Sequence, residues 1–402
     1  MAGKLPDGDP WPVDNKLALN DSGKSFHAYV HIPFCEVRCG YCDFNTYTAS
    51  EIGPIRRDDF HTSLIREIEF SKTFMKSNGY KPLQLASVFF GGGTPTLFSV
   101  GQISEVITSL RNAFGISTDA EITVEANPDT VSASYLDDLS KTGVNRISFG
   151  VQSFDSDVLK VLDRTHDPKR VPEVVELAKR SGLRVSVDLI FGTPGESLDS
   201  WKRTVGQALE LGVEHISAYA LIVESGTKLE RAIRSKEIAP VDEDLLADKY
   251  EWASQMFEDA GLLWYEISNW GNPSVHNRSY WSSSDWWGYG PGAHSHVGGT
   301  RWWNRKHPLA YKTSLETGSP AQALEILPER ARLEERLLLE LRTIDGVENT
   351  VLKQLGVQPE KVASYLSQGL VELLPNQKLR VTKRGRLLAD GIVLELLSGS
   401  EA

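Results

Sequence analysis

The chain has only three cysteines among its 402 residues, and all three lie between positions 35 and 42. Three clustered thiols do not make a disulfide framework, which needs paired cysteines spread along the chain. Long apolar runs are also missing, since no stretch reaches the about 20 residues that a membrane-spanning helix requires. The first two dozen residues lack the apolar segment of a signal peptide. We therefore expect a cytoplasmic protein without a transmembrane segment, and leave peripheral membrane contact open.

Positive charge is scarce as well. The 43 Lys and Arg residues face 54 Asp and Glu residues, and the net charge is -11. Affinity for nucleic acid comes largely from cations that neutralise phosphates, so we expect no nucleic-acid partner. With 402 residues, the chain is long enough for one large globular domain and a smaller one, and its 40% of hydrophobic residues can form a core in each.

Short β-branched and aromatic runs alternate with amphipathic stretches through the first 240 residues. The runs predict six strands, at residues 28–34, 87–90, 121–126, 146–152, 184–192 and 215–222. The stretches between them carry apolar residues at helical spacing. Such alternation predicts an α/β fold with a parallel sheet, and six units favour a partial (β/α)6 barrel.

We predict four segments along the chain. Residues 1–25 read as a polar N-terminal extension, with structure beginning near Phe26, and residues 26–241 form the partial barrel. Residues 242–327 begin with a helix and continue as a barrel-closing region rich in Trp and His, with few periodic elements. Residues 328–402 predict a helix, further short helices, and then two strands joined by a turn and followed by a helix. This order resembles an α+β winged-helix module. Without a basic surface, that module is better interpreted as a packing or partner domain.

The cysteines carry the most specific signal. Cys35, Cys39 and Cys42 form a C-x3-C-x2-C pattern directly after the first predicted strand. Three thiolates on a loop can hold three irons of a 4Fe-4S cluster and leave the fourth iron without a protein ligand. S-adenosylmethionine (SAM) can chelate that open iron, and its reductive cleavage yields a 5'-deoxyadenosyl radical. The alternative is a structural zinc site of three cysteines with His27 or His31, although zinc sites usually show a second ligand pair.

Glycines and polar residues follow the other predicted strands. The run Gly91-Gly92-Gly93 could leave backbone N-H groups free for a carboxylate. Glu125, Gln152 and Asp188 end the third, fourth and fifth strands, where barrels bind ligands. Each of them taken alone is better explained as a cap of the following helix, and only their joint occurrence behind the cysteine motif favours a ligand site.

Together these motifs resemble a known family. HIPFC-x3-C-x-YCDF, GGGTPT, EANP, GVQSF and DLIFGTPG are similar to the radical SAM proteins of the oxygen-independent coproporphyrinogen III oxidase group, from Tyr29 to the end of the chain. The resemblance implies Cys35, Cys39 and Cys42 as cluster ligands. It also implies SAM contacts from Tyr29, Tyr41, Gly92, Gly93, Thr94, Glu125, Gln152, Arg164, Asp188 and Ala220.

Two departures from the oxidases point to one branch of the group. The oxidases carry a fourth cysteine where this chain has Phe44, and residues 276–281 match an HNxxYW motif. Both features resemble the haem chaperone branch, HemW. That branch implies haem as a bound group, haem acceptor proteins as partners, and an electron donor such as flavodoxin or ferredoxin. Its motif implies haem contacts from His276, Asn277, Tyr280 and Trp281.

Several alternatives stay open at this point. A single histidine is more often a structural residue than an iron ligand, and His294 and His296 are rivals to His276. Phe44 could simply pack the cysteine loop. The competing functions are radical decarboxylation of porphyrinogen propionates by a coproporphyrinogen III oxidase, and modification of another substrate by a radical SAM methyltransferase.

Overall fold

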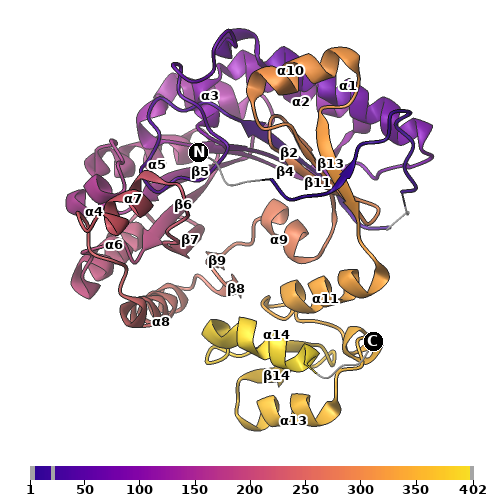
Figure 1. Ribbon diagram of the computed structural model, residues 1–402. Coiled ribbons are helices and arrows are strands. Elements are labelled where there is room, and N and C mark those ends of the chain that lie inside the picture. Colours follow the sequence, from indigo (N-terminus) through magenta and orange to yellow (C-terminus); the bar gives the residue numbers. More distant parts are fainter. Residues whose placement is uncertain (1–4, 20–22, 399–402) are drawn as a thin grey trace.

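The computed structural model describes residues 5–19 and 23–398, and a curved mixed sheet forms its centre (Figure 1). In this described part the sheet has 13 strands in the order β1-β13-β12-β11-β10-β2-β3-β4-β5-β6-β7-β9-β8. Strands β2 to β7 run parallel and confirm the six predicted strands; they span Phe26–Ile32, Leu85–Gly92, Ile116–Ala126, Arg146–Gln152, Arg184–Phe191 and His215–Ala220. The outermost described strands, β1 and β8, do not pair with each other. The barrel is therefore partial, as expected.

Helices cover the convex face of the parallel strands (Figure 1). They are α1 (His61–Ser77), α2 (Val100–Phe114), α3 (Ala133–Ser140), α5 (Val171–Arg180) and α6 (Leu198–Glu210). The shorter helices α4 (Ser156–Val161) and α7 (Lys228–Arg234) instead pack together with Ile190 of β6 in a small separate apolar cluster. Local signals set their ends: α2 starts at a capping box of Ser99 with Gln102 and stops at Gly115, whose φ is 75°. No helix in the described ranges is long and apolar enough to cross a bilayer.

The two faces of the parallel strands differ in polarity. Side chains alternate between faces along a strand. On β2, Ala28, Val30 and Ile32 join the hydrophobic core under the helices. His27, Tyr29 and His31 alternate with them and make polar contacts on the opposite, concave side. The hydrophobic core thus lies between sheet and helices, and the inside of the partial barrel is left for polar chemistry.

Residues 242–327 extend the sheet at both ends. Helix α8 (Glu243–Asp259) is followed by α9 (Val275–Trp281), α10 (Pro308–Thr317) and six strands: β8 (Trp264–Glu266), β9 (Asn269–Gly271), β10 (Asp285–Tyr289), β11 (His294–Val297), β12 (Thr300–Asn304) and β13 (Ala321–Ile326). Strand β9 pairs with β7, and β10 pairs with β2. The expectation of few regular elements here was wrong, because strands of three to six residues are too short to show a period.

The N-terminal segment is also part of the sheet. Strand β1 (Asp9–Pro10) pairs with β13, and the Trp11 ring packs against Phe74 and Trp302 at centroid distances of 5.2 and 5.7 Å. The predicted start of structure near Phe26 was therefore wrong, because two residues of pairing and one tryptophan suffice to anchor this segment. Residues 1–4 and 20–22 of the predicted extension lie outside the described residues.

The C-terminal elements follow the predicted order. They are α11 (Glu329–Glu340), α12 (Asn349–Gln354), α13 (Pro359–Ser367), β14 (Val371–Leu373), β15 (Leu379–Val381) and α14 (Ala389–Leu397). This C-terminal module, residues 329–398, lies below the sheet in Figure 1. Its Arg386 guanidinium stacks on the Trp264 ring at 4.0 Å and pairs with Glu258 at 2.9 Å, which fixes the module to the α8–β8 region. The four domain boundaries stay predictions, and residues 399–402 lie outside the described part.

Candidate radical SAM site

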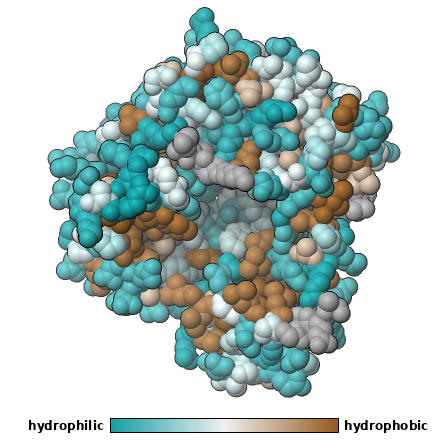
Figure 2. All heavy atoms as spheres, viewed as in Figure 1, coloured by the Kyte–Doolittle hydropathy of each residue, from teal (hydrophilic) through white to brown (hydrophobic). Residues whose placement is uncertain are grey.

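A cavity of about 760 Å³ opens at the carboxyl ends of the parallel strands. The molecule is hollowed near the centre of the face shown in Figure 2. All but one of the residues expected to contact the cluster, SAM or haem line this one cavity: Tyr29, Cys35, Cys39, Tyr41, Cys42, Gly92, Gly93, Thr94, Glu125, Gln152, Arg164, Asp188, Ala220, His276, Asn277 and Tyr280. The exception is Trp281, which lines a different cavity.

Backbone and side-chain hydrogen bonds hold the cysteine loop at three points. The Cys35 N-H donates to the Tyr47 carbonyl at 3.0 Å, and the Gly40 N-H donates to the Leu162 carbonyl at 3.2 Å. The Asn45 side-chain amide donates to the carbonyls of Pro291 and Lys306, each at 2.9 Å. The loop is therefore closed at its base by Cys35 and Tyr47, and is fixed to the end of α4 and to the turns beside β11 and β12.

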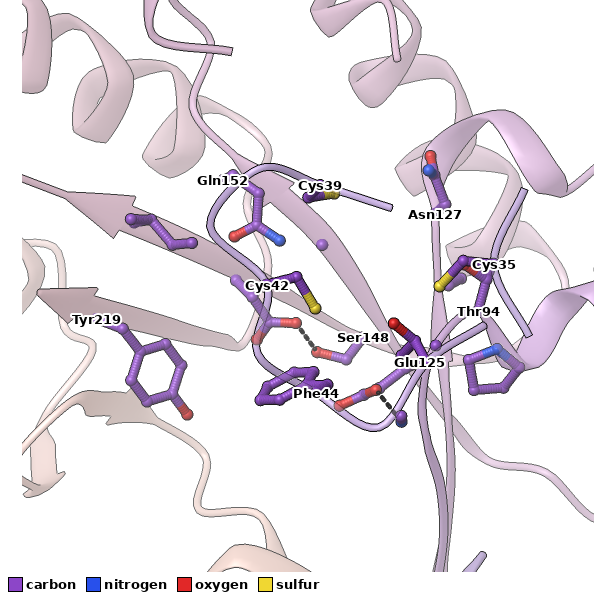
Figure 3. Close-up of a pocket in the computed structure, with 18 of the residues that line it drawn as sticks. Cys35, Cys39, Cys42, Phe44, Thr94, Glu125, Asn127, Ser148, Gln152 and Tyr219 are labelled. Atoms are coloured by element: carbon purple, nitrogen blue, oxygen red, sulfur yellow. Dashed lines mark hydrogen bonds between the residues drawn. The ribbon is translucent and has the colours of Figure 1, made fainter. Parts of the chain in front are cut away.

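The three thiols surround the cavity (Figure 3). Burial raises the pKa of Cys35, and it raises the pKa of Cys42 to about 11. Both thiols are therefore protonated at neutral pH, so metal binding must release their protons. Within residues 5–19 and 23–398, no three His, Cys, Asp or Glu side chains meet closely enough to hold a metal ion as they stand. The three thiols thus border the same cavity, but in the described structure they do not lie close enough together to bind a single metal ion.

Neither histidine of the zinc alternative faces these thiols. The His31 Nε2-H donates to the Asn45 carbonyl at 2.9 Å, and its Nδ1 lies 3.0 Å from the Tyr29 hydroxyl. His27 contacts Ser87 and Ser25, each at 2.8 Å, and lines a different cavity. The observed contacts leave a Cys3His zinc site without its fourth ligand.

The glycine run serves close packing rather than open N-H groups. The N-H groups of Gly92, Gly93 and Thr94 donate to the Glu125 carboxylate at 3.2 Å, the Ile32 carbonyl at 2.8 Å and the Phe34 carbonyl at 2.8 Å. The expectation of free N-H groups was therefore wrong for Gly92 and Gly93, because acceptors at the ends of the neighbouring strands β2 and β4 use these groups. A Cβ on Gly93 would lie 2.4 Å from the Phe34 carbonyl oxygen and 3.0 Å from the Cys35 Sγ, so only glycine lets the run pass beside that thiol.

Two carboxylates lie on the inner wall. Burial and the charge of Asp188 raise the pKa of Glu125 to about 8. Burial also raises the pKa of Asp188, which accepts hydrogen bonds from the Ser217 hydroxyl and, at 2.9 Å, from the Ser148 hydroxyl. Both carboxylates are buried and few positive charges lie near them. Such a pair favours a ligand that brings positive charge or hydroxyl groups.

Gln152 and Arg164 complete the wall near Cys39. Gln152 has a φ of 64° at a register shift between β5 and β6, a conformation that non-glycine residues adopt rarely. The Arg164 guanidinium donates to the Gly150 carbonyl at 2.5 Å and approaches the Cys39 Sγ at 3.7 Å, while its buried Nε has no hydrogen-bond partner in the described structure. A cation with an unused donor beside the thiols suits an anionic ligand group.

The HNxxYW motif forms most of α9, which lies on the concave side of the sheet (Figure 1). The buried His276 ring stacks on Phe89 at 5.0 Å and forms hydrogen bonds through both nitrogens, with Ser87 at 2.7 Å and with the Tyr280 hydroxyl at 2.9 Å. The Asn277 amide donates to Glu266 at 3.1 Å. His276, Asn277 and Tyr280 thus reach the same cavity as the thiols.

The rival histidines lie elsewhere. His294 is exposed on β11 beside Trp303, and the His296 Nδ1 donates to the Ser284 carbonyl at 3.1 Å. Neither residue lines the cavity that holds the thiols.

Known proteins resemble this chain in sequence and in fold. The family model for the radical SAM superfamily matches residues 29–208. Proteins named heme chaperone HemW are 40% identical in Mycobacterium tuberculosis, over 93% of this chain and 95% of the relative, and 35% identical in Bacillus subtilis, over 91% and 97%. The chain belongs to the HemW family of radical SAM proteins. The solved structure of coproporphyrinogen III oxidase (HemN) from Escherichia coli has a TM-score of 0.78 at 22% identity, over 93% of this chain and 90% of that one, and shows a shared fold.

Membership in the HemW family implies a 4Fe-4S cluster and SAM as cofactors. The residues present fit such a cluster: three thiols border one cavity, a glycine run passes beside one of them, and a guanidinium lies against another. Donors of this kind, on a loop fixed at three points, are typical of an iron-sulfur site.

Sequence reasoning missed several residues that line the cavity of this HemW family member. Arg146 and His215 begin β5 and β7, and Phe89 and Ser148 lie further along β3 and β5. Arg146 was detectable, since a cation that opens an otherwise apolar strand needs a buried anion nearby. That anion is Glu121, whose carboxylate lies 3.9 Å from the Arg146 Nε.

Proposed function

We propose that this protein is a haem chaperone that binds haem and delivers it to acceptor proteins, with a SAM-ligated 4Fe-4S cluster in the same cavity. One observation carries the proposal: His276 and Tyr280 line the cavity that also holds the three thiols. The HemW relatives, over more than nine tenths of the chain, support the same function. Phe44, in place of the fourth cysteine of the oxidases, supports it further.

Cys35, Cys39 and Cys42 would hold three irons of the cluster. When bound, the cluster and SAM supply one-electron reductive cleavage of the sulfonium. The Arg164 guanidinium would bind the SAM carboxylate, and Glu125 and Asp188 would take its amino group and ribose hydroxyls. The other proposed SAM contacts are Tyr29, Tyr41, Gly92, Gly93, Thr94, Gln152 and Ala220.

Haem would bind on the α9 side of the cavity. His276 is the proposed iron ligand, since neutral imidazole is a common axial ligand of haem and burial lowers the pKa of this ring well below its ordinary value. Its Nε2 is bonded to the Tyr280 hydroxyl, so Tyr280 must turn away when iron binds. The rings of Tyr29 and Phe89, stacked at 6.3 Å, offer apolar area for a porphyrin. Trp281, the remaining residue of the motif, lies away from this surface.

Delivery requires partners outside the chain. The proposed partners are haem acceptor proteins and a reductant of the flavodoxin or ferredoxin type. The side chains around the cavity mouth include the Phe44 ring, which is 62% exposed. An exposed aromatic at the mouth suits contact with an apolar ligand or with an acceptor.

The deciding experiment compares two activities in one preparation. Anaerobically reconstituted protein with SAM and a reductant is titrated with haem, and is separately incubated with coproporphyrinogen. We expect a haem Soret spectrum that saturates with added haem, and no vinyl-containing product. Stoichiometric decarboxylation would overturn the proposal in favour of the oxidase, and SAM-dependent alkylation of an added substrate would favour a methyltransferase.

The iron ligand is tested by His276→Ala. We expect weaker haem retention on gel filtration with unchanged cluster iron, because His276 lies apart from the thiol loop. His294→Ala is the matched control, since this exposed histidine does not line the cavity. Equal haem occupancy in His276→Ala and wild type would remove His276 as a ligand.

A further inference from the structure

A continuous chain of hydrogen bonds crosses the inside of the partial barrel. It starts at the Tyr280 hydroxyl, 2.9 Å from the His276 Nε2. The His276 Nδ1 lies 2.7 Å from the Ser87 hydroxyl, and the same hydroxyl lies 2.8 Å from the His27 Nδ1. The His27 Nε2 then contacts the Ser25 hydroxyl at 2.8 Å. We call these five residues the relay.

The relay joins two cavities. Tyr280 and His276 line the cavity of the thiols, whereas His27 and Ser25 line a second cavity of about 780 Å³. This second cavity lies between the start of β2, α9 and the C-terminal module. His27, Ser87 and His276 are each at most 2% exposed, so water does not replace their mutual hydrogen bonds.

Counting protons ties the relay members together. The Ser87 hydroxyl has one proton and can donate to only one of the two Nδ1 atoms, so the other Nδ1 must carry a proton and donate to Ser87. Both rings are buried and their nitrogens contact only neutral hydroxyl groups, so each ring is neutral and holds one proton. The tautomer of His276 therefore fixes the tautomer of His27, and the reverse.

One of the two directions suits iron binding. If the His276 Nδ1-H donates to Ser87, then Ser87 donates to the His27 Nδ1, and the His27 Nε2-H donates to Ser25. The His276 Nε2 is then a bare lone pair that accepts from the Tyr280 hydroxyl. A phenol is a better donor than acceptor, which favours this direction over one in which the His276 Nε2-H donates to Tyr280.

We propose that Ser87 and His27 are positioning residues that hold His276 in the tautomer whose Nε2 lone pair faces the cavity. No covalent bond forms or breaks in the chain of hydrogen bonds: when Tyr280 turns away, the His276 Nε2 lone pair that accepted its hydrogen bond would be free to ligate haem iron. Partners of this kind fix ring orientation and tautomer in metal sites. The inference rests on the proposed function only for the identity of the ligand, since the relay itself exists without haem.

The first test uses the haem-free protein. Histidine labelled with ¹⁵N distinguishes protonated from bare ring nitrogens by chemical shift, and His276→Ala identifies the His276 signals. We expect wild type to show a protonated Nδ1 and a bare Nε2, and Ser87→Ala to shift His276 toward the opposite tautomer. A protonated Nε2 in wild type, or the same tautomer in both proteins, would overturn the inference.

The second test adds haem. Ser87→Ala should weaken haem binding by about tenfold and shift the Soret band while cluster iron stays unchanged. Ser186→Ala is the matched control, because this buried serine contacts the Nδ1 of another cavity-lining histidine, His215, at 2.7 Å. Ser87→Thr keeps the hydroxyl and should restore the tautomer and the haem spectrum. Equal haem affinity and Soret position in Ser87→Ala and wild type would overturn the inference.

The two failures are distinguishable. If His276→Ala retains haem as wild type does, the haem role of His276 is lost, whereas the tautomer measurement in the haem-free protein still decides whether the relay exists. If His276→Ala loses haem but Ser87→Ala does not, the proposed function stands and the positioning role is wrong.

Discussion

Glu121 and Glu125 lie four residues apart on β4, yet their surroundings are opposite. Glu121 accepts hydrogen bonds from the Ser274 hydroxyl at 2.8 Å and the His276 N-H at 3.2 Å, and lies within 4 Å of two arginines, Arg146 and Arg184. Glu125 accepts one hydrogen bond among the described residues, from the Gly92 N-H at 3.2 Å. One strand thus carries a carboxylate with several partners in its middle, Glu121, and one with a single partner at its end, Glu125.

On this one strand, Glu121 therefore has a structural role, whereas Glu125 is available to bind a ligand. The Glu121 carboxylate joins β4, β5 and the start of α9, so it supports the position of the HNxxYW motif. The Glu125 carboxylate faces the cavity, and its raised pKa reflects the lack of cations and hydrogen-bond donors around it. A ligand that brings a positive charge or hydroxyl groups would provide these partners. A substitution at Glu121 should therefore lower stability, and a substitution at Glu125 should lower cofactor binding.

The largest effect is expected at the thiol loop. Cys42→Ser should abolish the 4Fe-4S cluster almost completely, because a hydroxyl is a poor iron ligand in place of a thiolate. Its unfolding free energy without cluster should match that of wild type within about 0.5 kcal/mol, since the thiol is only partly buried. Iron and sulfide analysis together with urea unfolding checks both. Full iron content in the variant would contradict the assignment of Cys42.

Glu121→Gln should show the reverse pattern. Removing the charge leaves the Arg146 guanidinium, which is 6% exposed, without its close anion, and the unfolding free energy should fall by about 3 kcal/mol. Urea unfolding of the cluster-free protein measures the change. Glu125→Gln is the matched control and should not lower stability. Equal losses of stability in both variants would contradict the contrast between Glu121 and Glu125.

The smallest effect concerns pH. The pKa of Glu125 is about 8 in the folded protein against an ordinary 4.5, so the folded state keeps a proton that the unfolded chain loses first. This group's contribution to the unfolding free energy therefore falls as pH rises from about 4.5 to about 8. Between pH 6 and pH 8, cluster-free wild type should lose more stability than Glu125→Gln. Identical pH slopes would show that Glu125 titrates normally.

The six parallel strands could be predicted because each is a β-branched run that is bounded by a helical pattern. The cysteine motif and the strand-end residues were equally readable, since a parallel sheet brings all its carboxyl ends to one side. The added strands β8 to β13 were not readable, because their pairing depends on β2 and β7 and not on their own periods. The same holds for β1, which is ordered only through β13.

The direction in which a side chain points could not be predicted from the local motifs. His276 and Tyr280 are four residues apart and share a helix face, whereas Trp281 falls one step further round and lines the second cavity. Ser87 contacts His27, which is 60 positions away in the sequence, and His276, which is 189 positions away. No local sequence pattern predicts contacts over such separations. The glycine run suggested open N-H groups, but Gly92 donates to Glu125 on β4 and Gly93 donates to Ile32 on β2.

The Asn45 side chain has a consequence for biosynthesis. It ties the loop of the thiols to the carbonyls of Pro291 and Lys306, which are translated about 250 codons later. While the ribosome still works on the middle of the message, those acceptors do not exist, and β2 also lacks its neighbour β10. The cavity at the thiol loop therefore reaches its final form only after residue 306 has emerged from the ribosome, so we expect cofactor loading when most of the chain has been made.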